Sequence, residues 1–460
     1  MVNWGEGLFY RGGINTSNPI DATKYRLPGS EVKEVLIPLE AFSFSLGLTD
    51  NLSMEAYYQW NWKETAIDPV GTFFSTTDLF GDGGNTAYAS VNNPLISQVL
   101  GAYPLATQFG LVGNGPFGPN KYLDPQTGTF VVANVGSDIN AKDDGQFGVA
   151  FRYVAESLND TEFGFYFVNY HAQEPQLAVD FDGYHGVDFT NPLWGVVPEV
   201  ARPALAGIDA AGNAVARSEY PENIRMYGLS FSTVVGDASV FGELAYRPNL
   251  PVAIASANDV VTDILSQTLL GISNLPDGSV PDNQACALVA GQSLCRSVML
   301  HNYTRVEAFD TSIGTIYNFG PALSFNSMIG VAEIASEHIR GSSLTYTAYD
   351  GTKRTFTGSG VYNTMDRDAW GYTLTTSGTW NDVYAGVNLS PYLVFKHDVK
   401  GVSNMTGRFN EGAKAQTIGL RASYQNNIQT ELQYTAFFGA GQENRMRDRD
   451  NVGFNVKYLF

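Results

Sequence analysis

The 460-residue sequence predicts an all-β fold, a transmembrane antiparallel up-and-down β-barrel. Runs of alternating apolar and polar residues recur along the chain, and short turns alternate with long connections. Charged residues make up only 16% of the chain, whereas aromatic residues make up 13%. Because side chains along a strand point alternately to opposite faces, such runs separate an apolar face from a small or polar one. A strand wall between lipid and a solvated lumen requires this separation.

The last nine residues show the alternation most clearly. One face of this predicted strand carries Val452, Phe454, Val456, Tyr458 and Phe460. An edge strand of a soluble β-sandwich could alternate in the same way, but the termini of soluble proteins are usually polar and frayed. The closing strand of bacterial outer-membrane barrels ends as this chain does. Phe454, Tyr458 and Phe460 therefore resemble the signal that the barrel assembly machinery recognises.

Six further hairpins precede this strand, and together they predict thirteen strands after residue 35. Their short turns are expected near Thr49–Asn51, Ser157–Asp160, Gly236–Asp237, Gly320–Pro321, Trp380–Asn381 and Asn426–Asn427. A strand ending at Trp4 would make fourteen, and bacterial barrels have an even number. No signal peptide precedes Asn3, so we expect an N-terminal part to be missing, and two more strands would give sixteen.

Three long connections, 63–145, 172–223 and 248–303, are rich in turn-forming residues. Loops of this length are uncommon in compact soluble domains but normal on the cell exterior of outer-membrane barrels. We therefore expect a single barrel over 1–460, with short periplasmic turns and long loops that are extracellular or folded into the lumen. Residues 252–272 predict a short amphipathic helix. Cys286 and Cys295 fit one disulfide in an oxidising compartment.

The face opposite the apolar side chains predicts which residues line the lumen. These candidates are Glu55, Tyr57, Gln59, Arg152, Glu162, Glu243, Arg247, Arg421, Glu431 and Lys457. Arg152 and Glu162 fall on neighbouring strands near one turn, as do Arg421 and Glu431. Lys457, on the next strand, is expected near the level of Glu431. Mixed-sign neighbours can bridge the wall or be separately solvated, and neither arrangement forms a single-sign ring that would select ions.

Several classes of function are disfavoured. The formal net charge of -19 leaves no basic stripe for nucleic acid. The five histidines do not fall in metal-ligand spacings and no serine nucleophile elbow occurs, so we expect neither an enzyme nor a cofactor. Asp78, Asp82 and Asn85 could hold calcium through oxygen ligands, although Gly/Asp turns explain the same pattern.

Long motifs in residues 3–80 resemble a known family. They are Asn3-Trp4-Gly5-Glu6, Gly12-Gly13-Ile14-Asn15, residues 26–34, residues 45–60 and residues 69–75. The sequence is similar to the proteobacterial outer-membrane family DUF1302, a domain of unknown function. The resemblance implies a Gram-negative outer membrane, with its lipid and lipopolysaccharide as surroundings. It also implies transport of hydrophobic or lipid-like compounds, alongside a periplasmic or lipoprotein carrier and an inner-membrane hydrophobe exporter.

Three functions therefore stay open. The expected one is a passive outer-membrane channel that passes or hands over hydrophobic or amphiphilic small molecules. The second is a structural or adhesive surface barrel whose acidic loops bind a partner or divalent cations. The third is a general porin. An apolar tunnel would favour the first, a sealed lumen the second, and an open polar pore the third.

Overall fold

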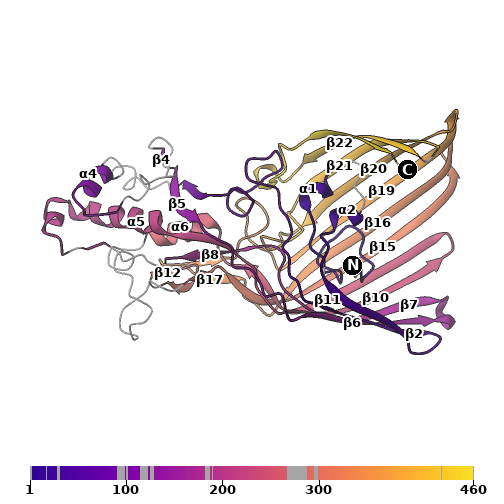
Figure 1. The fold of residues 1–460 in the computed structure, drawn as a ribbon, viewed down its shortest axis with the longest axis horizontal. Helices are drawn as coiled ribbons and strands as arrows, with labels where there is room; N and C mark the ends of the chain where they lie inside the picture. Colours follow the sequence, from indigo (N-terminus) through magenta and orange to yellow (C-terminus); the bar gives the residue numbers. More distant parts are fainter. Residues whose placement is uncertain are drawn as a thin grey trace.

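The computed structural model describes residues 3–16, 18–27, 32–90, 99, 102–113, 123–124, 129–181, 187–188, 190–266, 287–294, 299–425 and 427–458. Its main body is one curved antiparallel sheet in which successive strands lie side by side (Figure 1). The strands are β1 (Ala41–Gly47), β2 (Leu52–Gln59), β6 (Gln146–Ala155), β7 (Thr161–Tyr170), β10 (Ile224–Val235), β11 (Ala238–Ala253), β15 (Tyr303–Ala322), β16 (Phe325–Arg340), β19 (Asp368–Tyr384), β20 (Val387–Lys400), β21 (Lys414–Tyr424), β22 (Ile428–Phe438) and β23 (Asn451–Tyr458). The described residues thus form a thirteen-stranded sheet. A total of fourteen or sixteen strands stays a prediction.

The outer face of this sheet is apolar and uncovered. Along β23, the exposed fractions of Val452, Phe454, Val456 and Tyr458 lie between 59% and 70%. Large apolar side chains are exposed in the same way on the strands before it, among them Phe165, Leu229, Ile313, Leu374 and Leu432. A monomeric soluble protein rarely exposes so extended an apolar surface. A strand wall that faces lipid does.

The short turns lie at one end of the sheet and the long connections at the other (Figure 1). Neighbouring turns contact one another: the Val154 amide donates to the Asn51 carbonyl at 2.9 Å, and the Asn318 amide donates to the Asp237 carbonyl at 3.1 Å. Because every strand pairs antiparallel with the next, the turns that follow β1, β6, β10, β15, β19 and β21 share this end.

Two turns differ from their predicted places. Gly320 and Pro321 belong to β15, and the turn after them comes at Leu323 and Ser324, which have φ values of 49° and 71°. Trp380 and Asn381 belong to β19, where the Trp380 ring lies 4.4 Å from the Phe325 ring, centroid to centroid. The turn comes instead at Ala385 and Gly386, which have φ values of 45° and 86°. Positive φ at both central residues gives a tight hairpin turn whose twist matches that of the flanking strands. The Trp-Asn pair therefore does not mark the turn.

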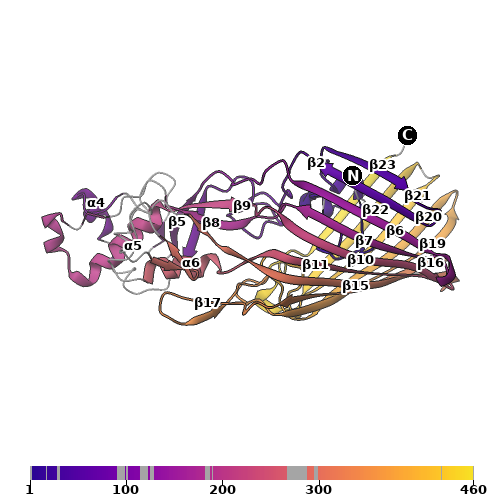
Figure 2. The same cartoon turned by 90° about the horizontal axis from the view of Figure 1, so that it is seen from below.

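The connections 63–145, 172–223 and 248–303, predicted as long loops, contain strands and helices over part of their length. They form an extension beyond one end of the sheet (Figure 2). Its elements are a sheet of β3 (Thr86–Ser90), β4 (Leu123–Asp124), β5 (Thr129–Val135), β8 (Gln176–Asp180), β9 (Val215–Glu219) and β14 (Leu300–His301), the hairpins β12–β13 (Ala287–Val289, Gln292–Leu294) and β17–β18 (Thr345–Thr347, Lys353–Thr355), and helices α4 (Tyr103–Gln108), α5 (Arg202–Asn213) and α6 (Ala257–Ser266). Short 3-10 turns complete the chain: η2 (Glu156–Leu158), η3 (Pro192–Val196), η4 (Glu199–Ala201) and η5 (Gly441–Glu443).

The extension has an apolar core of its own, which includes Phe181, Ile264 and Leu300, each at most 5% exposed. The helix predicted over 252–272 begins later than expected, because Val252 and Ala253 continue β11 and α6 (Ala257–Ser266) starts only at Ala257. Residues 267–272 of the predicted helix lie outside the described residues.

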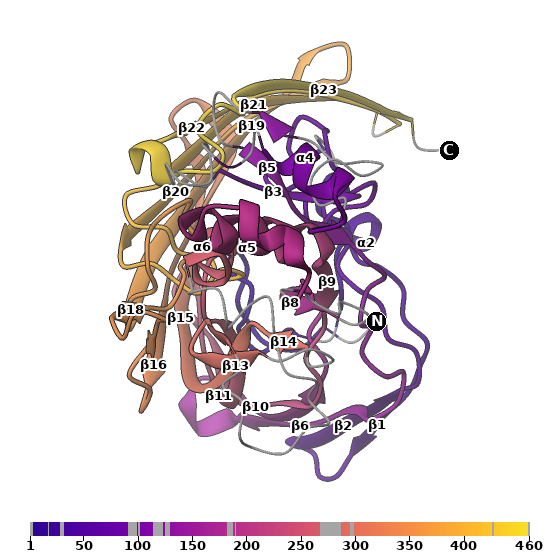
Figure 3. The same cartoon turned by 90° about the vertical axis from the view of Figure 1, so that its left-hand side faces the viewer.

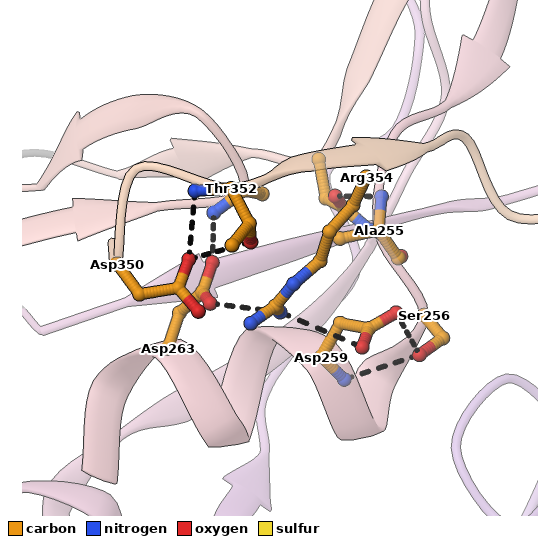
Figure 4. Close-up of polar contacts among 9 residues, drawn as sticks. Ala255, Ser256, Asp259, Asp263, Asp350, Thr352 and Arg354 are labelled. Carbon is orange, nitrogen blue, oxygen red and sulfur yellow. Dashed lines mark hydrogen bonds and ion pairs between the residues drawn. The ribbon is translucent and has the colours of Figure 1, made fainter. Parts of the chain in front are cut away.

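A buried ion pair joins two connections, 248–303 and the one between β16 and β19 (Figure 4). Asp263 of α6 has a fully buried side chain, and its Oδ1 lies 3.0 Å from Arg354 Nη1 of β18. Its Oδ2 accepts the Ala290 amide, from the turn of the β12–β13 hairpin, at 3.0 Å. Burial raises the pKa of Asp263, and the partners Arg354 and Ala290 act in the opposite direction. The connections therefore brace one another as a folded layer.

The two edge strands of the main sheet, β1 and β23, are not paired with each other in the described part of the chain. Figure 3 shows them apart, with α2 (Val32–Val35) on the side between them. The Lys457 ammonium of β23 lies 3.5 Å from Glu34 of α2. The short helix α1 (Ala22–Tyr25) precedes α2. The helices of the described residues are all too short or too polar to cross a bilayer.

Candidate functional site in the lumen

Residues 3–16, here called the lumen segment, lie inside the curve of the sheet. Trp4 is 3% exposed, and its indole donates to Glu55 of β2 at 2.7 Å. Tyr10 contacts Thr373 of β19 through its hydroxyl, so the segment touches strands far apart in the sheet. The expectation that a strand ends at Trp4 is therefore wrong, because this residue packs within the lumen.

Two wall carboxylates hold the backbone of the lumen segment. Glu243 of β11 accepts the amides of Glu6 at 2.7 Å, Gly7 at 3.1 Å and Ile14 at 3.1 Å. Glu333 of β16 accepts the amides of Leu8 at 3.1 Å and Phe9 at 2.7 Å. An irregular segment away from water must find partners for its amides, and bonds to an ionised acceptor are the stronger kind. The two glutamates therefore anchor the segment without a covalent link.

Glycines let the carboxylate approach so closely. A Cβ on Gly13 would lie 1.6 Å from Glu243 Oε1, so any side chain at that position would displace the carboxylate that holds the segment. Gly12 has a φ of 87°, and a Cβ there would overlap the guanidinium of Arg408. The glycine density of the segment thus has a direct packing reason.

The wall has matching hollows for the apolar side chains of the segment. A Cβ on Gly148 of β6 would lie 2.7 Å from the Trp4 ring, and one on Gly228 of β10 would lie 2.8 Å from Ile14 Cγ1. The Trp4 ring also packs on Tyr57, with centroids 5.1 Å apart. Wall and segment are therefore complementary in shape as well as in hydrogen bonding.

A buried charge cluster surrounds the other end of the lumen segment. Arg247 of β11 is 1% exposed and donates to Tyr170 Oη at 2.9 Å and to the Gly13 carbonyl at 2.6 Å. Its Nη1 lies 2.8 Å from Asp310 Oδ2 of β15. The other oxygen of Asp310 pairs with Arg408 at 2.8 Å. The cluster ties the segment to three strands, β7, β11 and β15, and to an inward-folded connection.

That inward-folded connection, residues 401–413 between β20 and β21, covers the segment. Phe409 is 1% exposed and its ring lies 5.3 Å from the Tyr10 ring, centroid to centroid. The Lys396 ammonium lies over the Tyr10 ring, 5.6 Å from its centroid. The segment is therefore clamped between the wall and residues 401–413.

Three cavities follow one another along the lumen. A mouth cavity of about 380 Å³ lies among the long connections and includes Phe80 and Met446 in its lining. A middle cavity of about 250 Å³ is lined by Arg11, Arg247 and Asp310, among others. A turn-side cavity of about 690 Å³ lies near the short turns. Residues 11–16 line the middle cavity and Glu6 lines the turn-side cavity, so the lumen segment separates these two.

The structure places most lumen candidates around this segment or in wall ion pairs. Glu55, Tyr57, Glu243 and Arg247 contact the segment. Arg152 Nη1 lies 2.8 Å from Glu162, and Arg421 Nε lies 3.2 Å from Glu431, which also accepts the Tyr392 hydroxyl. Gln59 is 4% exposed and donates to the Asn61 carbonyl at 2.7 Å.

Lys457 does not join the level of Glu431. Its register partner on β22 is Gln429, whereas Glu431 lies opposite Asn455. Lys457 instead forms an ion pair with Glu34, across the open side of the sheet. Arg421, Glu431 and Lys457 therefore do not form one row across the wall. The register of β22 and β23 places Lys457 opposite Gln429, two residues away from Glu431.

Sequence reasoning missed Glu333, Glu337 and Asp310. Phe325, Ile329 and Val331 suggested that the odd-numbered positions of β16 face lipid, whereas Glu333 shows that they face the lumen. Asp310 has the even parity expected for the inner face of β15, so parity alone could have identified it. Nothing local in the sequence marks a carboxylate that binds a segment hundreds of positions away.

Other predicted sites remain untested. Cys286, Cys295 and Phe460 lie outside the described residues, so the disulfide and the terminal aromatic stay predictions. Asp78, Asp82 and Asn85 lie in turns before β3, where the Asn85 amide group donates to the Gly83 carbonyl. The described residues contain no group of three or more His, Cys, Asp or Glu side chains that could hold a metal ion.

Comparison with family models gives one match that spans residues 1–460, to the family described as "Protein of unknown function (DUF1302)". The chain belongs to this family. A comparison with curated proteins finds no match.

Among solved structures, the chain is similar to a ferric enterobactin receptor of Pseudomonas aeruginosa, with 10% identity and a TM-score of 0.31 over 86% of this chain. The match spans 40% of the receptor's length. It is also similar to the Pseudomonas putida toluene transporter TodX, with 10% identity and a TM-score of 0.24. That match covers 87% of this chain and 91% of TodX.

Proposed function

We propose that this DUF1302 protein is a passive outer-membrane channel for hydrophobic or amphiphilic small molecules, closed at rest by its lumen segment. The observation that carries the proposal is the position of residues 3–16 between two cavities. Five backbone amides bound to Glu243 and Glu333 hold the segment there. Because these bonds are reversible, the segment can act as a gate.

The uncovered apolar face supports a Gram-negative outer-membrane location, with lipid and lipopolysaccharide around the sheet. By the usual asymmetry of such barrels, the short turns face the periplasm and the extension faces the exterior. The last strand would be recognised by the barrel assembly machinery. A periplasmic or lipoprotein carrier and an inner-membrane hydrophobe exporter are the partners that this role requires.

The contents of the lumen do not suit a general porin. The segment fills the level of Glu243 and Glu333 and separates the middle cavity from the turn-side cavity. Charges of both signs line the middle cavity, so no single-sign ring would select ions. Passage therefore requires displacement of the segment.

A surface-binding role is the second candidate, because the extension carries exposed apolar side chains on its helical part. They are Leu105, Phe109, Val196 and Val200, with exposed fractions from 51% to 79%. An exposed apolar group of this kind can bind a partner. In that case the lumen would stay closed permanently.

Uptake into vesicles distinguishes these functions. Purified protein is placed in liposomes, and entry of the hydrophobic dye N-phenyl-1-naphthylamine is compared with entry of glucose. We expect faster entry of the dye alone, relative to protein-free liposomes. Equal acceleration of both solutes would indicate a porin. No acceleration of either, even after Glu243 and Glu333 are replaced with glutamine, would indicate the surface-binding role.

A further inference from the structure

The mouth cavity is lined mainly by apolar side chains, and neither the lumen segment nor the ion pairs of the sheet account for this lining. Apolar side chains from four separate connections meet there: Ile67, Phe80, Pro175, Met405 and Met446. Methionines adapt their shape to an apolar ligand, and about 380 Å³ lies within the range of small-molecule sites. The long connections therefore build a hollow, mainly apolar site above the lumen.

One cation in this lining lacks an ionic partner. The guanidinium of Arg445, between β22 and β23, donates Nε to the Ser359 carbonyl at 3.0 Å and Nη2 to the Gly360 carbonyl at 2.7 Å. No carboxylate of the described residues lies within ion-pair distance of it. The nearby Glu443 is bound by the amides of Tyr362 and Asn363.

This arrangement differs from that of other arginines that are buried or half-buried. Arg247, Arg354 and Arg408 each pair with an aspartate at 3.0 Å or less. Arg26, which also lines the mouth cavity, pairs with Asp68. Burial lowers the pKa of Arg445, and the charge of Glu443, which is not within ion-pair distance, opposes this only in part.

We propose that the mouth cavity binds a monoanionic amphiphile, with its anionic head on Arg445 and its tail along Phe80 and Met446. This inference rests on the proposed function and names its substrate class. A guanidinium favours a planar carboxylate over a hydroxyl or an ammonium, because it offers parallel charged donors. The apolar walls supply the rest of the affinity through burial of the tail.

The cavity is also directly connected to the gate. Glu174 lines both the mouth cavity and the middle cavity, and its Oε1 lies 2.9 Å from Arg11 Nη1 of the lumen segment. Thr406 and Gly407 line both cavities as well. A molecule bound at Arg445 therefore lies in the cavity adjacent to the one that the lumen segment lines.

Calorimetric titration of the protein in lipid nanodiscs tests the proposal with three probes of equal chain length: decanoate, decanol and decyltrimethylammonium. Empty nanodiscs correct for partition into lipid. We expect decanoate to bind most tightly, and Arg445→Gln to weaken decanoate about tenfold, which is the value of one charge-assisted contact. Decanol binding should not change with this substitution.

Arg447→Gln is the matched control, because Arg447 lies in the same connection and donates to the carbonyls of Gln442 and Asn444 without lining the cavity. Arg445→Lys keeps the positive charge and should keep the preference for decanoate. This variant shows that a loss in Arg445→Gln comes from the missing charge and not from misfolding. Equal affinity for decanoate and decanol, or an equal loss in Arg447→Gln, would overturn the inference. Dye uptake that persists in that case would leave the channel proposal standing.

Discussion

Replacing Glu243 and Glu333 with glutamine should open the lumen, with dye entry into liposomes at least about ten times faster than in the wild type. Each glutamine keeps the size of the side chain but removes the charge that five segment amides share. Hydrogen bonds to charged groups contribute about 1.5–3 kcal/mol each. Loss of only 1.4 kcal/mol from the closed state raises the open population about tenfold.

Glu431→Gln is the control for this prediction. Glu431 faces the same lumen but binds Arg421 and Tyr392 instead of the lumen segment. Its replacement should leave dye entry unchanged. If the double variant Glu243→Gln/Glu333→Gln also behaves like the wild type, the two carboxylates do not hold a gate.

Arg247→Met should cost about 3–5 kcal/mol of barrel stability, because it breaks a buried ion pair from one side. Arg247 is 1% exposed and bonds Asp310, Tyr170 and the Gly13 carbonyl. Its removal leaves Arg408 as the remaining arginine beside Asp310 and Glu337, which are register partners on β15 and β16. The loss can be measured as a lower temperature for the gel-mobility shift that marks unfolding of barrels in detergent.

A second substitution should recover part of this loss. Glu337→Gln in the Arg247→Met background restores the charge balance of the cluster, and Glu337 Oε1 has no hydrogen-bond partner in the structure. Arg225→Met is the matched control, since Arg225 lies on β10 with an exposed side chain. Equal stability of Arg247→Met and Arg225→Met would show that the cluster does not brace the lumen.

The main sheet could be predicted from the sequence because its signal is local. Period-two alternation in runs such as 452–458 is dictated by a wall that separates lipid from lumen. Hairpin partners are close in sequence, so Arg152–Glu162 and Arg421–Glu431 follow from strand parity and a short turn. The open edge between β1 and β23 has no such local signal.

The lumen segment could not be predicted, because it has no period and its anchors are remote. Glu243 is 229 to 237 positions from the amides it binds, and Glu333 is 324 and 325 positions away. The only local sign is glycine at positions 5, 7, 12 and 13, which also suits an ordinary loop. The structured extension was missed for the same reason, since Asp263 meets Arg354 only after both connections fold.

A reversible lock on the lumen segment tests the account most directly. The lock is a disulfide between Ile14→Cys and Gly228→Cys. Ile14 Cγ1 lies 2.8 Å from the position that a Cβ on residue 228 would take, so the two new side chains are close enough to form this bond. The pair is built into the Glu243→Gln/Glu333→Gln variant with Cys286→Ser and Cys295→Ser, and dye entry is measured before and after reduction. We predict slow entry when the lock is oxidised and fast entry when it is reduced. Equally fast entry in both states would contradict the claim that residues 3–16 close the channel.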